Sequence, residues 1–156
     1  RAERPPQAPR SARSPSFPLQ PTRPGAIRTM RVLYVDDDRV NLLLFTELCR
    51  LAPGVEVELA GTAEEAMETA PSFAPDLLVL DLHLPDGDGF ALLARLRDTP
   101  GRRVPAYLCS ADDPTLLDVQ ARGAGFEACW AKPLDVPLVL AALQRQAAAL
   151  SGTPQA

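Results

Sequence analysis

Five short apolar runs alternate with five segments of helical periodicity after Met30, and this alternation restricts the fold more than any other feature of the sequence. Strands that are joined through a helix pair in parallel, because the crossover returns the chain to the same end of the sheet. The sequence therefore predicts an α/β fold with a five-stranded parallel sheet and helices on both faces. The expected strands cover residues 31–36, 55–60, 77–81, 104–110 and 126–131, and the expected helices cover residues 39–51, 63–70, 89–98, 114–123 and 136–149.

Capping residues mark several of the expected helix starts. Thr62 and Glu65 have the spacing of a capping box. Asp38, Asp113 and Asp135 each precede a helical segment and are expected to act as N-caps or to support them.

Residues 1–29 differ in composition from the rest of the chain. They hold seven of the 17 prolines, six arginines and a single acidic residue, Glu3. This composition predicts a disordered tail or linker, followed by one domain over residues 30–150 and a short tail over residues 151–156. The part from Met30 onward is strongly acidic, with ten basic and nineteen acidic residues, which argues against direct nucleic-acid binding.

Other classes of protein are excluded by what the sequence lacks. No apolar stretch approaches the ~20 residues that cross a bilayer, and no secretory signal opens the chain. The three cysteines, Cys49, Cys109 and Cys129, are odd in number and far apart, so they predict neither a disulfide framework nor a zinc site. We expect a cytoplasmic protein without membrane insertion.

Polar side chains gather where the expected strands end. Asp81 ends the apolar run LLVLD, Asp36 and Asp37 end the first strand, Ser110 ends the fourth, and Lys132 follows the fifth. Because parallel strands end at one edge of the sheet, these side chains should converge there, where open α/β sheets bind their ligands. Lys132 is the only lysine of the chain, against fifteen arginines.

The chemistry that such a cluster supports is narrow. Carboxylates close together repel one another unless they share a cation, and oxygen ligands of this kind suit Mg²⁺. An aspartate can also act as a nucleophile and form an aspartyl-phosphate. Lys132 would then neutralise charge on the transferring group, and Ser110 would donate a hydrogen bond to it. The following turn carries Asp86 and Asp88, which we expect to serve the turn itself and the N-terminus of the next helix.

Four stretches together resemble the receiver domain of two-component response regulators. They are VLYVDDD (32–38), LLVLDLHLPDGDGF (77–90), PAYLCSA (105–111) and GFEACWAKPLD (125–135), in the order and spacing of that family. The resemblance implies a flavodoxin-like (βα)5 fold with strand order 2-1-3-4-5. In detail the residues of these motifs are most similar to those of receivers at the C-terminus of hybrid sensor histidine kinases. A proline-rich linker before the domain agrees with that setting.

The resemblance also implies a role for each residue of the site. Asp81 would accept a phosphoryl group from a phosphohistidine, and Asp37, Asp81 and the backbone carbonyl of His83 would ligate Mg²⁺, with Asp36 helping through water. Ser110 matches the switch hydroxyl. Lys132 matches the lysine that pairs with the phosphoryl group.

The partners implied are a histidine kinase or a histidine phosphotransfer domain, and the domain could also form a weak dimer. The domain would not be an enzyme in its own right, because it catalyses only its own phosphorylation and dephosphorylation. One position departs from the family pattern. Cys129 stands where the family usually has Tyr or Phe, and the adjacent Trp130 is expected in the core.

Two other functions stay open at this point. An aspartate-nucleophile phosphatase of the haloacid-dehalogenase type uses similar residues, but it places its nucleophile on the first strand with a second aspartate two residues later, where this chain has His83 after Asp81. A degenerate receiver that only binds partners would be expected to lose an acidic residue or the lysine. This chain keeps all of them.

Overall fold

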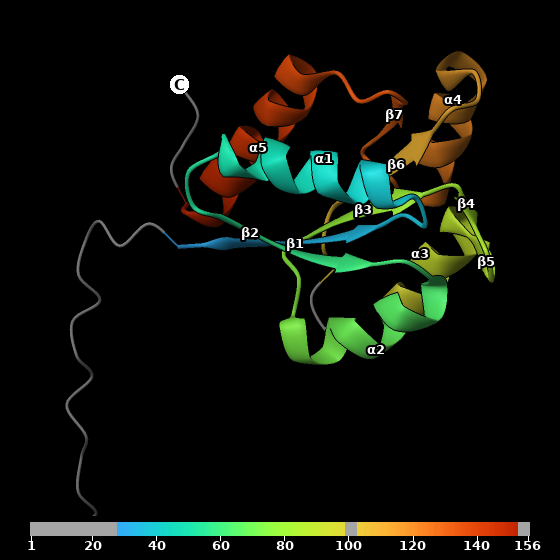
Figure 1. Ribbon diagram of the computed structural model, residues 1–156, viewed down its shortest axis with the longest axis horizontal. Coiled ribbons are helices and arrows are strands. Elements are labelled where there is room, and N and C mark those ends of the chain that lie inside the picture. Colours follow the sequence, from blue (N-terminus) through green and yellow to red (C-terminus); the bar gives the residue numbers. More distant parts are fainter. Residues whose placement is uncertain (1–27, 99–102, 153–156) are drawn as a thin grey trace, which may run out of the picture.

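The fold is described from a computed structural model, which covers residues 28–98 and 103–152 (Figure 1). The tail expected over residues 1–29 lies almost entirely outside the described residues, as does most of the tail expected over residues 151–156. The strands are β1 (Met30–Val35), β2 (Val55–Ala60), β3 (Leu77–Asp81), β4 (His83–Leu84), β5 (Gly87–Asp88), β6 (Ala106–Ser110) and β7 (Ala128–Ala131). The helices are α1 (Arg39–Arg50), α2 (Ala63–Phe73), α3 (Gly89–Asp98), α4 (Pro114–Ala124) and α5 (Val136–Leu150).

The main sheet has five parallel strands in the order β2-β1-β3-β6-β7. Counted among the parallel strands alone, this is the order 2-1-3-4-5, so the predicted flavodoxin-like topology is confirmed. A second, antiparallel pair, β4-β5, forms within the acidic turn after β3 and was not predicted. Each of its strands has two residues, which is too short for any periodicity in the sequence to indicate them.

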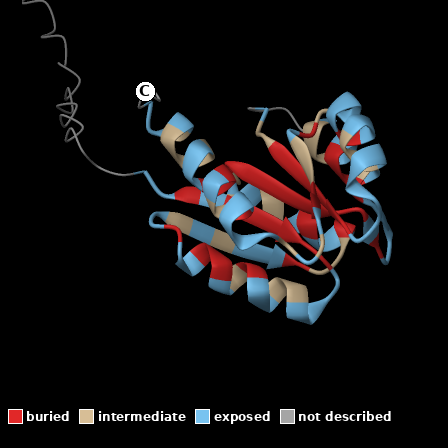
Figure 2. Ribbon diagram, turned by 90° about the horizontal axis from the view of Figure 1, so that it is seen from above, coloured by how far each residue is buried: buried red, intermediate tan, exposed pale blue. Residues whose placement is uncertain are grey.

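The sheet separates two apolar cores, because the central strands β1, β3 and β6 are buried on both faces. One core packs under α1 and α5, with Phe45 and Leu143 fully buried in it. The other packs under α2 and α3, with Leu92 and Leu93. Figure 2 shows this layering, with buried strands between helices whose outer faces are exposed. Among the helices of the described residues, none combines the length and the hydropathy that a membrane-spanning segment needs.

The helix caps follow the sequence pattern except in one case. Thr62 accepts a hydrogen bond from the Glu65 N–H (3.0 Å), and Asp38 accepts one from the Val40 N–H (2.8 Å). The expectation for Asp86 was wrong. Its carboxylate accepts hydrogen bonds from the N–H groups at the start of the preceding helix, α2, because the β3–α3 turn folds back against that helix end.

Two strands begin later than predicted, β6 at Ala106 rather than residue 104 and β7 at Ala128 rather than residue 126. Before β7, the chain ends α4 at Gly125, which adopts the left-handed conformation (φ 102°). Phe126 then donates its N–H to Ala121 O (2.9 Å) and buries its ring in the core under α2 and α3. Gly125 and Phe126 therefore complete the C-terminal cap of α4, and β7 begins only at Ala128.

We predict that Gly89→Ala destabilises the fold by about 1–3 kcal/mol, which is the usual cost of overpacking. A Cβ at this position would lie 2.6 Å from the backbone oxygen of Asp81 and 2.8 Å from Leu108 Cδ1. Gly123→Ala is the matched control, because it lies within α4 and its Cβ would meet nothing within 4 Å. Urea unfolding should show the control as stable as the wild type or more stable. Equal stability of both variants would contradict the close approach at Asp81.

Candidate functional site

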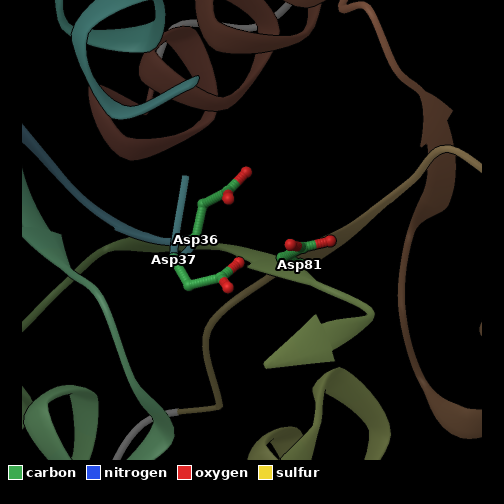
Figure 3. Close-up of side chains that lie close together, drawn as sticks. All are labelled: Asp36, Asp37 and Asp81. Carbon is green, nitrogen blue, oxygen red and sulfur yellow. The ribbon is translucent and has the colours of Figure 1, made fainter. Parts of the chain in front are cut away.

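Three carboxylates meet at the carboxyl edge of the sheet, as the sequence predicts (Figure 3). Asp36 and Asp37 follow β1, and Asp81 is the last residue of the neighbouring strand β3. One oxygen atom from each lies within 4.8 Å of the others. Asp36 and Asp81 are buried, whereas Asp37 is exposed to solvent. The cluster therefore presents one open carboxylate and two that the fold holds in place.

Asp36 is the most tightly held of the three. Its Oδ2 accepts hydrogen bonds from Tyr34 OH (2.9 Å), Asn41 Nδ2 (3.1 Å) and Lys132 Nζ (2.7 Å). Its Oδ1 accepts one from the Asp38 N–H (2.9 Å). Because these donors occupy most of its lone pairs, Asp36 orients the site rather than offering a free ligand oxygen.

Lys132 bridges the two buried carboxylates. Its Nζ lies 2.7 Å from Asp36 Oδ2 and 3.0 Å from Asp81 Oδ2, and its side chain is 15% exposed. Burial by itself lowers the pKa of Lys132, but the hydrogen bonds to Asp36 and Asp81 outweigh it, so the pKa is raised. The ammonium is therefore charged at neutral pH and is placed beside any group that Asp81 binds.

The pKa of Asp81 is raised above the ordinary value of an aspartate. Burial is the largest cause, and the nearby charge of Asp36 adds to it. Lys132 and the backbone N–H of His83 act in the opposite direction, because both stabilise the ionised form. A carboxylate that is partly desolvated in this way is more basic than one in water, which favours its use as a nucleophile.

Ser110 and Asp112 border the site where β6 ends. Ser110 is fully buried at the end of that strand, and its Oγ accepts a hydrogen bond from the Asp112 N–H (3.0 Å), which leaves its own O–H free to donate. The exposed side chains of His83 and Asp112 pair with each other at 2.9 Å. The start of β4 and the loop after β6 are therefore linked at the exposed side of the site.

The donor set fits a hard divalent cation. Asp37 and Asp81 offer carboxylate oxygens at the same edge, and such oxygens, together with water and phosphoryl oxygens, are the usual surroundings of Mg²⁺. In the described residues, this is the one group of three or more His, Cys, Asp or Glu side chains that lie close enough to hold a metal. The side chain of His83 turns to Asp112, so at most the backbone of His83 is available to an ion.

Other acidic residues of the motifs lie outside the site. Asp38 caps α1, as predicted, and Asp88 accepts a hydrogen bond from the Ala91 N–H at the start of α3 (2.8 Å). Asp86 caps α2 instead. Sequence reasoning missed Tyr34 and Asn41 as partners of Asp36. The signal for Tyr34 is its position two residues before Asp36, which places both on the same face of a strand.

Cys129, which departs from the family pattern, and the adjacent Trp130 point into different cores. Trp130 is buried, as predicted, and stacks on Tyr107 with the ring centroids 4.2 Å apart, under α1 and α5. Cys129 points to the other core and is only partly buried. Its backbone N–H donates to Asp118 of α4 (3.0 Å). The neighbouring large side chain therefore does not occupy the place of the usual aromatic residue.

Comparisons with known proteins agree with the site. The family model of the response regulator receiver domain matches residues 32–144. The chain is 31% identical to the polar-differentiation response regulator DivK of Brucella ovis over 110 residues, which are 70% of this chain and 89% of DivK. It is 33% identical over 114 residues to a protein-glutamate methylesterase/protein-glutamine glutaminase of Anaeromyxobacter dehalogenans, covering 72% of this chain but 30% of that protein.

A solved structure shows the same likeness in three dimensions. The signal receiver domain of an HD domain-containing protein from Pseudomonas fluorescens superposes with a TM-score of 0.68 at 28% identity, covering 81% of this chain and all of that one (100%). The likeness spans the whole of that domain. In contrast, the chain spans less than half the length of some of its curated relatives.

Asp81→Asn is expected to raise the free energy of unfolding at pH 7 in the absence of divalent cations. The pKa of Asp81 is higher in the folded state than the ordinary value, so folding disfavours its ionised form. This penalty is absent below the ordinary pKa of Asp, about 4, and grows as the pH rises through the folded pKa. Urea unfolding at pH 7 and at pH 3.5 measures both ends of this range.

Asp37→Asn is the control for that measurement, because it removes an exposed charge from the same cluster. The gain in stability at pH 7 should be larger for Asp81→Asn than for the control, and it should shrink at the lower pH. A loss of stability at pH 7 in Asp81→Asn would show that the bridge to Lys132 outweighs the cost of burial.

Proposed function

Because this chain belongs to the response regulator receiver domain family, we propose that Asp81 is its phosphoacceptor and takes the phosphoryl group from a phosphohistidine of a partner protein. Receiver domains act in two-component signalling and interact with histidine kinases or phosphotransfer proteins. The observation that carries the assignment of Asp81 is its position. Asp81 is a buried carboxylate with a raised pKa at the carboxyl edge of the sheet, and its Oδ2 lies 3.0 Å from the ammonium of Lys132.

The transfer needs a nucleophile, a leaving group and compensation of charge. An oxygen of Asp81 attacks phosphorus, the bond from phosphorus to the imidazole nitrogen breaks, and that nitrogen keeps the electron pair. Lys132 Nζ then stands beside the phosphoryl oxygens, and the O–H of Ser110 can donate to one of them. Asp36 holds Lys132 in place throughout, because the two are hydrogen-bonded at 2.7 Å.

We assign the metal ligands to Asp37, Asp81 and the backbone carbonyl of His83, with Asp36 acting through water. Mg²⁺ bound there would supply positive charge to the phosphoryl oxygens. The four hydrogen bonds that Asp36 accepts support its indirect role. The exposure of Asp37 supports its direct role, since an ion can reach it from solvent.

The wider setting of the domain is also a proposal. We place the receiver domain at residues 30–150, after a proline- and arginine-rich linker, as in the C-terminal receiver of a hybrid sensor histidine kinase in the cytoplasm. The chain covers 30% and 44% of two of its curated relatives, which fits a receiver that is one module of a longer protein. Its own role would be that of a signalling module rather than an enzyme.

The proposed function predicts one phosphoryl adduct at Asp81. Incubation with acetyl phosphate and Mg²⁺ should add about 80 Da to the wild-type protein, the nominal mass of one phosphoryl group. Asp81→Asn should show no adduct, because an amide is a far poorer nucleophile than a carboxylate. Asp88→Asn is the matched control, since Asp88 is exposed, lies on the same loop and caps α3.

Intact mass spectrometry distinguishes the outcomes. An adduct on Asp81→Asn would contradict the assignment. Repeated release of phosphate from acetyl phosphate at a rate typical of enzymes would favour a phosphatase instead. Failure of the wild type to form any adduct would favour a domain that only binds partners.

An apolar surface next to the site gives the donor protein a place to dock. Val40, Leu43 and Leu44 on α1 are 63%, 63% and 59% exposed, although each is a large apolar side chain. Their spacing places them on one face of a helix that begins beside the site, after its N-cap Asp38. An amphipathic helix of the donor fits such a surface, as helix-to-helix contacts bury apolar side chains of this kind.

We predict that the double variant Leu43→Gln, Leu44→Gln slows phosphotransfer from a phosphohistidine protein by about tenfold or more, which corresponds to the loss of two apolar contacts. Its phosphorylation by acetyl phosphate should be unchanged, because a small donor needs no docking surface. The matched control is Leu116→Gln, Val119→Gln on α4, whose side chains are 77% and 75% exposed. Equal slowing in both double variants would mean that the α1 surface has no special role.

A further inference from the structure

Two arginine side chains meet at the edge of the sheet opposite to Asp81. Arg97 comes from the last turn of α3, and Arg103 lies shortly before β6. They line a pocket of about 450 Å³ together with Val104, Gly125, Glu127 and Gln146. The pocket lies at the amino edge, because residues 103–105 precede β6 and residues 125–127 precede β7. It is therefore separate from the site at the carboxyl edge.

The fold accounts for the position of Arg97. Its Nη1 donates to Gly125 O (3.0 Å) and its Nη2 to Val104 O (3.1 Å). Its Nε is buried and has no hydrogen-bond partner in the described part of the chain. Burial, and then the charge of Arg103, lower the pKa of Arg97, while Glu127 opposes this. Arg97 is thus a fixed, part-buried cation that forms no salt bridge within the described residues, although the acidic Glu127 lines the same pocket.

The contacts of the fold do not account for Arg103. A Cβ built on Gly125 would meet Nη1 of Arg97 and would lie 3.2 Å from Nη2 of Arg103, so both guanidinium groups face the same small space. Within residues 28–98 and 103–152, neither arginine forms a salt bridge. Arg103 is exposed and no hydrogen bond or salt bridge to the described residues holds it, so an anion between the two guanidinium groups would offset their mutual repulsion.

We propose that this pocket binds a small molecule that carries a phosphate group, with Arg97 and Arg103 on the phosphate oxygens. A phosphate carries the charge to match two guanidinium groups, and the planar fork of arginine suits its oxygens. The volume is within the range of about 300–1,000 Å³ that is usual for small-ligand sites. The Gln146 amide nitrogen donates to Tyr107 OH (3.1 Å), so its amide oxygen is the group that can contact the remainder of the ligand, whereas Glu127 reduces the positive charge of the pocket.

The test is a titration of the full chain with inorganic phosphate, pyrophosphate or adenosine monophosphate at constant ionic strength, followed by NMR. EDTA keeps divalent cations away from Asp81. We expect saturable shifts of the Gly125 and Glu127 amides. Arg103→Gln should weaken binding by about tenfold or more, as for the loss of a charge-assisted hydrogen bond. Glu127→Gln should strengthen it, because a negative charge leaves the pocket.

Arg122→Gln is the matched control, since it removes one exposed arginine that pairs with Asp118 on α4 and does not line the pocket. It should bind phosphate as the wild type does. The relative response to the three probes shows how much of the ligand beyond one phosphate group the pocket contacts. The proposal is overturned if no probe gives a saturable shift, if Arg103→Gln and Arg122→Gln weaken binding equally, or if the shifts occur only at the Ser110 and Ala131 amides.

Discussion

The contact of Lys132 with Asp36 and Asp81 is the interaction on which the site depends. It joins the ends of β1 and β3 to the loop after β7, and the lysine is 96 residues from Asp36 in the sequence. Two buried carboxylates at neighbouring strand ends would otherwise repel each other in a region of low polarity. The ammonium offsets that repulsion while leaving Asp81 only partly neutralised. The same ion contacts therefore hold the sheet edge together, while burial keeps the pKa of Asp81 raised.

The orientation of Asp36 also depends on the apolar core beneath the sheet. Tyr34 both stacks on Phe45, with ring centroids 4.1 Å apart, and donates its hydroxyl hydrogen to Asp36. The apolar core under α1 is thus connected to the charged edge through one side chain. Asp36 keeps its orientation because the ring that holds it cannot move without disturbing the core.

Much of this could be predicted from the sequence, because it depends on local patterns. The apolar runs end on the polar residues of the site, and parallel strands must bring those ends together, so the sequence predicts that Asp36, Asp81 and Lys132 lie close together. The partners Tyr34 and Asn41 were missed, since neither a tyrosine in a strand nor an asparagine in a first helical turn is distinctive. Asp86 was given to the wrong helix for a related reason. The two N–H groups of α2 that donate to Asp86 lie 22 and 23 residues earlier in the sequence. Only the packing of the turn against α2 decides which helix end Asp86 contacts.

Helix α4 is held to the sheet by less apolar contact than its neighbours. Ala121 is its one buried residue within the described structure, whereas α1, α3 and α5 each bury three. Little hydrophobic free energy is lost when a helix of this kind separates from the sheet, so its opening costs less than global unfolding. The amide hydrogens of α4 should consequently exchange with solvent sooner than those of α1, α3 and α5. Helix α4 is then the least stable helix of an otherwise cooperative domain.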